Sequence, residues 1–191
     1  ALAAEQVPNI IGDIYIGAEA GRTAYGTSNG VATNSVYIGR RSAYALGGAN
    51  DTAALGASSF EYASSANSSV GIGSFSGRYG THSYMVEIGS KAGSKSGTYN
   101  TSVLIGHSAL GDATSVGTIS QSTIIGARTF ESATVNNISN SIILGDSTYN
   151  SGGAISLNRI ILLDAQASSR TASNEVTIGN GLHTAYRMYA A

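Results

Sequence analysis

The chain has 191 residues, of which 11% are charged, and its formal net charge is −1. This composition excludes the basic surface that nucleic-acid-binding proteins and polybasic membrane-binding segments need, so we expect no nucleic-acid partner and no membrane insertion. The chain contains no cysteine, which excludes disulfides and thiolate metal sites. Its 42% hydrophobic residues argue against disorder and, with many Ile, Val and Tyr, favour a packed β structure.

One six-residue pattern recurs along the chain. It consists of two small or polar residues, an apolar residue, any residue, Ile or Leu, and finally Gly; the clearest copy is Asn34–Gly39. A repeat of this length is too short for a pair of helices and fits one coil of a β-solenoid. In chain order the ten copies close at Gly17, Gly39, Gly56, Gly73, Gly89, Gly106, Gly126, Gly145, Leu163 and Gly179, 16–22 residues apart.

Each copy predicts a strand of about three residues that ends at the glycine. Side chains alternate along a strand, so the residues three and one before the glycine share a face. We expect these residues to point inward, and the residue between them to point outward. Weaker patterns after some copies predict a second short strand in each coil, at 42–47, 76–80 and 108–111.

The middle position of the strand is apolar in four consecutive copies, at Leu104, Ile124, Ile143 and Ile161. If these side chains point outward, they need a covering surface. We therefore predict that they pack between the chains of a parallel homotrimer, with 101–179 as its regular, trimer-forming part. The alternative is a sheet covered on both faces within one chain.

Two protein families resemble parts of this sequence. The Asn-Ser-Val-x-Ile-Gly unit, with a following Ser-x-Ala piece, resembles the head repeats of trimeric autotransporter adhesins, although the spacing here is longer and less regular. The segments 172–181 and 184–187 are similar to bacteriophage tail fibres and tailspikes just before a C-terminal intramolecular chaperone. That resemblance implies a trimeric β-helical fibre with upstream fibre segments. It also implies a chaperone beyond Ala191 that cuts itself off at a serine, so we expect a mature fibre to end where this sequence ends.

Motifs for catalysis are absent: no nucleotide-binding glycine loop, zinc-protease motif or serine-nucleophile elbow is present. The carboxylates of Asp146 and Asp164 each follow the closing position of their copy, which keeps open a polysaccharide-cleaving pair. Solvated corners or backbone caps are the favoured interpretation, and the absence of Trp argues in the same direction. His107 is the least implausible ligand for an ion on a three-fold axis, but we predict no metal, cofactor or catalytic residue.

Tyrosine is the residue type that suggests binding, because the chain has 11 Tyr but only three Phe. Its flat apolar ring and hydroxyl suit contacts with sugars. Tyrosines and arginines fall together in the irregular connections of 18–100, which we predict to form the receptor surface. The predicted contact residues are Tyr25, Arg40, Arg41, Tyr44, Tyr62, Arg78, Tyr79 and Tyr99.

The sequence thus predicts an all-β, parallel β-solenoid or β-helix over 1–191, assembled as a side-by-side or intertwined homotrimer. The expected function is attachment of a virion to a host-surface polysaccharide, either O-antigen or capsule, by an extracellular tail fibre without enzyme activity. Two alternatives remain: a polysaccharide depolymerase, and a trimeric adhesin head on the outer surface of a bacterium that binds host matrix.

Overall fold

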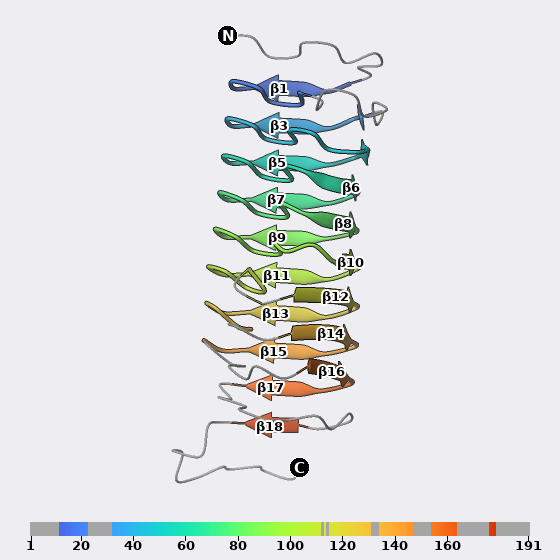
Figure 1. The fold of residues 1–191 in the computed structure, drawn as a ribbon, viewed down its shortest axis with the longest axis vertical. Helices are drawn as coiled ribbons and strands as arrows, with labels where there is room; N and C mark the ends of the chain where they lie inside the picture. The colour runs from blue at the N-terminus through green and yellow to red at the C-terminus, as the bar shows by residue number, and fades with distance from the viewer. Residues whose placement is uncertain are drawn as a thin grey trace, which may run out of the picture.

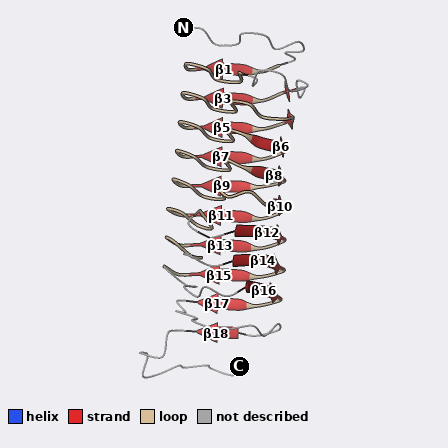
Figure 2. Cartoon of the chain, in the orientation of Figure 1, coloured by secondary structure: helices blue, strands red, loops and turns tan. Residues whose placement is uncertain are grey.

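The computed structural model describes residues 12–22, 32–111, 113, 115–130, 134–146, 154–163 and 176–178. These residues contain strands and turns but no helix, and they form a β-solenoid in which every strand pairs in parallel with the strands of adjacent coils (Figures 1 and 2). The predicted all-β parallel solenoid is confirmed. Each coil contributes strands to two sheets, which we call the first and the second sheet.

The first sheet has ten strands, and each of them comes from one copy of the repeat. Its order is β1 (Ile14–Ile16), β3 (Val36–Ile38), β5 (Ala53–Leu55), β7 (Val70–Ile72), β9 (Val86–Ile88), β11 (Val103–Ile105), β13 (Thr123–Ile125), β15 (Ile142–Leu144), β17 (Ile161–Leu163) and β18 (Val176–Ile178). The register keeps equivalent residues side by side, with one adjustment. Ile161 pairs with Ile142 and Leu163 with Leu144, so the ninth copy begins one residue later than the sequence pattern indicates.

The second sheet has eight strands, which precede the strands of the first sheet by a two-residue corner. They are β2 (Ala32–Thr33), β4 (Ala49–Asn50), β6 (Ala63–Asn67), β8 (Gly80–Ser83), β10 (Thr98–Asn100), β12 (Ser115–Ser120), β14 (Thr134–Ser139) and β16 (Ala154–Asn158). The predicted positions of these strands were wrong. Segments 42–45 and 108–111 are turns, and the strand of each coil begins several residues later.

The side chains of the first sheet face opposite to the prediction. From β1 to β17 the middle residue of the strand points into the solenoid: Leu104, Ile124 and Ile143 are fully buried in the core of their own chain. They therefore cannot contact another chain, and the proposed trimer-packing role of these three residues is wrong. Ile161 differs because of the register shift: it occupies a flanking position and is half-buried on the outward face.

In six repeats the second position is Ser or Thr, and this small residue builds the corner between the sheets. The Ser122 hydroxyl donates to the carbonyl of Ser120 and accepts the backbone N–H of Ser141 in the next coil, at 2.8 and 3.2 Å. Ser35, Ser69, Ser102 and Ser141 make the same type of contact with the next coil. Buried corner N–H groups are thereby satisfied, which explains why the repeat favours serine at this point.

The closing glycines form a column in which neighbouring backbones touch. Gly106 has φ of +132°, and a Cβ on it would collide with the carbonyl oxygen of Gly126. Gly89 meets Gly106 in the same way. Only glycine combines this backbone conformation with such close stacking, so the repeat requires it.

The interior is filled by two groups of buried side chains. The N-terminal group contains Tyr37, Phe60 and several alanines, and the C-terminal group is rich in Leu and Ile. Side-chain sizes compensate between sheets and turns: the Phe60 ring occupies the space that a side chain at Gly71 would need. The middle position of the repeat can therefore vary widely in size while the core stays filled.

Candidate functional site

The turns that lead from the first sheet to the second stack on one another. In these turns, backbone N–H groups point alternately to the preceding and the following coil. Arg41 donates to Ala18, and Ala43 donates to Ser59, at 2.9 and 2.8 Å. Alternate residues adopt positive φ, including Arg41, Ala43 and Ala45. This regular stacking brings residues from successive coils into a line on the surface.

Three tyrosines from successive coils form such a line, which we call the tyrosine ladder: Tyr44, Tyr62 and Tyr79. The rings of Tyr62 and Tyr79 stack with centroids 6.0 Å apart and planes 9° apart. Tyr44 meets Tyr62 edge-on at 5.6 Å. Tyr62 and Tyr79 remain 41% and 37% exposed, so the ladder presents ring surface and hydroxyl groups to solvent.

Two arginines support the ladder. The guanidinium carbon of Arg41 lies 5.3 Å from the ring centre of Tyr44, and that of Arg78 lies 4.9 Å from the ring centre of Tyr79. Arg78 also lies 4.9 Å from the ring centre of Phe75. Contacts of this kind hold the rings in place and put positive charge beside them.

Acidic residues alternate with these arginines from coil to coil. Arg41 donates to Glu19 at 2.6 Å, and Arg78 donates to Glu61 at 2.9 Å. Glu61 is buried, and Arg41 also lies 3.7 Å from it, so two cations compensate its charge. The hydrogen bond from Arg41 lowers the pKa of Glu19 and raises the pKa of Arg41 itself, which keeps both groups charged.

The structure brings together five of the eight predicted receptor residues: Arg41, Tyr44, Tyr62, Arg78 and Tyr79. Arg40 is exposed on the same turn. Tyr25 lies outside the described residues. Tyr99 is fully buried, with its hydroxyl donating to the carbonyl of Lys95 at 2.9 Å, so its predicted place on the receptor surface is wrong.

Phe75 and the acidic partners Glu19 and Glu61 were not among the predicted residues. A signal for the acidic partners exists: the second residue after the closing glycine is Glu19 and then Arg41 in the first two copies, and the fifth is Glu61 and then Arg78 in the next two. Alignment of the turns on the glycines would have placed opposite charges on adjacent coils.

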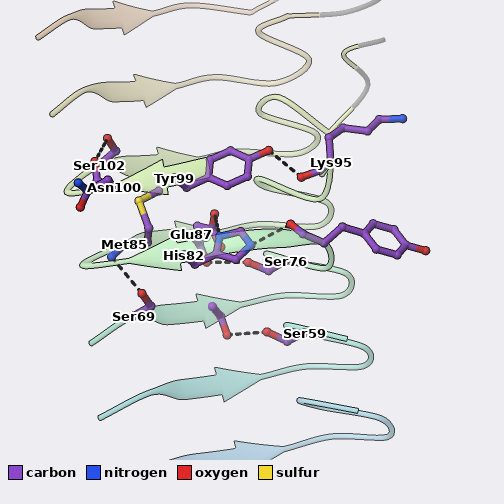
Figure 3. Close-up of polar contacts among 12 residues, drawn as sticks. Ser59, Ser69, Ser76, His82, Met85, Glu87, Lys95, Tyr99, Asn100 and Ser102 are labelled. Atoms are coloured by element: carbon purple, nitrogen blue, oxygen red, sulfur yellow. Dashed lines mark hydrogen bonds and ion pairs between the residues drawn. The ribbon is translucent and has the colours of Figure 1, made fainter. Parts of the chain in front are cut away.

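A second polar group, not predicted, lies inside the solenoid, where His82 meets Glu87 (Figure 3). The Nδ1 atom of His82 is 3.1 Å from Oε1 of Glu87, and both side chains are fully buried. The ring of His82 stacks on Tyr99 at 4.8 Å and meets Phe60 edge-on. Burial raises the pKa of Glu87, although the nearby His82 opposes this rise.

The hydrogen bonds of this pair assign its protons. Nε2 of His82 lies 2.9 Å from the carbonyl oxygen of Tyr79, which only accepts, so Nε2 carries a proton. One further proton lies between Nδ1 and Glu87, the pKa of which is raised by burial. The second oxygen of Glu87 has no hydrogen-bond partner among the described residues, and Tyr99 covers the ring of His82, so the pair is enclosed in the core.

Side chains that could bind a metal do not converge in the described part of the chain. No cluster of three or more His, Asp or Glu side chains that could hold a metal ion occurs there. Asp146 lies exposed after β15, and its proposed companion Asp164 is outside the described residues. Among the described residues no helix is long and apolar enough to cross a membrane.

Comparisons with protein-family models, with curated proteins and with solved structures found no match to this chain.

Proposed function

We propose that this chain is the structural and receptor-binding part of an extracellular fibre, of the kind that a bacteriophage tail uses to attach to a host-surface polysaccharide. The elongated solenoid supports the structural part of this proposal, because parallel coils stacked along one axis make a stiff body (Figure 1). The fibre is a homotrimer joined to upstream segments, and its ligand is O-antigen or capsule.

The tyrosine ladder is the observation that carries the binding role. Its rings offer flat apolar surfaces to sugar rings, and the tyrosine hydroxyls can exchange hydrogen bonds with sugar hydroxyls. The side chains of Arg41 and Arg78 are 39% and 30% exposed, and their guanidinium groups can donate to hydroxyls or carboxylates of the glycan. Three copies of the ladder on one fibre raise a weak affinity for each sugar by avidity.

The test is binding of the protein to purified lipopolysaccharides and capsular polysaccharides on an array, followed by titration of any positive glycan. Replacement of Tyr62 and Tyr79 by alanine should weaken binding by about tenfold or more, the usual loss for aromatic hot spots. Tyr84→Ala is the matched control, because Tyr84 is 66% exposed but lies at the corner between β8 and β9, away from the ladder.

Equal loss in the control, or unchanged binding in the ladder variant, would contradict this assignment. Release of reducing sugar from a bound polysaccharide would show a depolymerase instead. Binding to matrix proteins and to no glycan would favour an adhesin head.

A further inference from the structure

The outward face of the first sheet carries two columns of aliphatic side chains. They are the first and third residues of the ten three-residue strands, and we call them the aliphatic strip. Nineteen of its twenty positions are Ile, Val, Leu or Ala, and the remaining one is Thr123. The strip has no charged residue from β1 to β18.

The side chains of the strip are only partly covered by their own chain. Ile14 is 50% exposed, Ile142 is 42% exposed and Val176 is 63% exposed. Most others, such as Val103 and Ile105, are half-buried. Ten strands at about 4.8 Å spacing give a length of roughly 43 Å, and two columns about 7 Å apart give a strip roughly 10 Å wide.

This area is unusual for a face that stays in water. A strip of these dimensions covers roughly 400 Å² in projection, comparable with the largest apolar patches on monomers, which are often binding sites. Together with a partner strip it buries about 800 Å² or more, and the rims around it extend the contact towards the size of specific interfaces.

We propose that the aliphatic strip packs against the same strip of other copies of this chain, parallel and in register. A partner must match a surface that repeats once per coil over ten coils, and another copy has the same period and length. The absence of charge also suits self-association, because symmetry places identical charges near one another around an axis.

The narrow shape of the strip fits packing around a central axis. Each strip has two columns, so in a ring of three each column meets a column of a different neighbour. The tyrosine ladder lies on the turns rather than on the strip, so assembly leaves it exposed. The count of three rests on the proposed fibre function, whereas the identity of the interface does not.

The test is the native mass of the wild type and two double variants by multi-angle light scattering. Ile105→Lys with Ile125→Lys places two charges on adjacent coils of the strip. Thr98→Lys with Thr118→Lys places the same charges on adjacent coils of the second sheet, on its outward face. Circular dichroism monitors the β structure of each variant.

We expect the wild type and the second-sheet variant near 57.9 kDa, three times the 19.3 kDa chain, and the strip variant near 19.3 kDa with its β structure intact. If the lysines prevent folding, Ile105→Thr with Ile125→Thr should give a folded protein that dissociates at a concentration at least tenfold higher. A monomeric wild type, or a strip variant of unchanged mass, would overturn the proposal. A mass of two chains would support the strip interface and contradict the three-chain fibre. Loss of glycan binding without a change in mass would test only the role of the tyrosine ladder in binding and not the strip interface.

Discussion

The outward faces of the two sheets differ in chemistry although both lack charge. The first sheet presents the aliphatic strip, whereas the second presents columns of Ser, Thr and Asn, such as Thr98, Thr118 and Asn137. Hydrogen bonds run along the second face, for example from Asn50 to Asn67 at 3.2 Å. Two surfaces of one solenoid, built from strands of similar kind, thus have opposite affinities for water.

Strand propensity does not explain this difference. Threonine is β-branched like valine and forms strands equally well, as its columns in the second sheet show. Val and Ile on the first sheet are therefore not needed to make the strands. The difference is accounted for if the second face meets solvent and the first meets other chains.

The largest effect is expected where a side chain points inward. Leu104→Ala should lower the free energy of unfolding by about 2–5 kcal/mol, because it leaves a cavity between fully buried neighbours. Urea unfolding at several protein concentrations measures this cost, which should not depend on concentration. The adjacent Val103 points outward from the same strand. The loss of unfolding free energy caused by Val103→Ala should therefore grow with protein concentration. If Val103→Ala lowers the free energy of unfolding of the dissociated chain as much as Leu104→Ala does, the orientation of the side chains in β11 is contradicted.

Loss of a corner serine should have the next largest effect. Ser122→Ala removes the acceptor for the backbone N–H of Ser141 and leaves that buried group unsatisfied, which costs about 1–3 kcal/mol. Thermal unfolding against Ser115→Ala, an exposed serine of the second sheet, measures the difference. Equal and small changes in both variants would show that the serine column does not stabilise the corner.

A pH-dependent effect is expected for the buried pair. The pKa of Glu87 is raised in the folded state, so its contribution is fully present below about pH 4.3, the unfolded value, and is lost as pH rises through the folded pKa. Glu87→Gln keeps the shape without the charge, so it should gain stability relative to the wild type as pH rises, by about 1.4 kcal/mol for each unit of pKa shift.

Unfolding free energies between pH 4 and pH 8 test this expectation. Glu19→Gln is the control, for which the pH dependence has the opposite direction. The pKa of Glu19 is lowered in the folded state, so the wild type loses the stability contributed by Glu19 as pH falls. A constant difference between the wild type and Glu87→Gln over this range would exclude a titrating Glu87.

The smallest effect is expected on the polar face. Thr98→Val with Thr118→Val should change the free energy of unfolding by no more than about 0.5 kcal/mol for each site, as for other exposed positions. Thermal unfolding and native mass measure it. A large gain in stability with an increase in mass would show that any aliphatic column induces assembly, and would weaken the distinction between the two faces.

The repeat pattern predicted the solenoid and all ten strands of the first sheet, because a glycine marks the end of the strand in nine of the ten copies. It did not predict which way the side chains point. Pattern analysis places the more hydrophobic side of a strand inside its own chain. Here the outward positions, such as Val86 and Ile88, are more aliphatic than the inward Glu87. The pattern therefore predicted the reverse of the observed side-chain orientation.

The same inversion concealed the buried pair and led to a wrong assignment of contacts between chains. With the middle position assigned outward, Glu87 was placed on the outer face, and Leu104 was assigned to a contact between chains. The tyrosine ladder was largely predictable, because Tyr44, Tyr62 and Tyr79 recur at nearly one per coil. Tyr99 was not distinguishable from them, since its burial depends on its place in β10 rather than in a turn.

Thiol labelling tests most directly whether other copies cover the first sheet. The chain has no cysteine, so single probes report one position each. We predict that Thr118→Cys in the native protein reacts with a soluble maleimide at the rate of a free thiol, whereas Ile105→Cys reacts at least about tenfold more slowly and becomes reactive in the dissociated protein. Leu104→Cys should stay protected in both states, because its own core covers it. Equal and rapid reaction of Ile105→Cys and Thr118→Cys in the native protein would contradict the account.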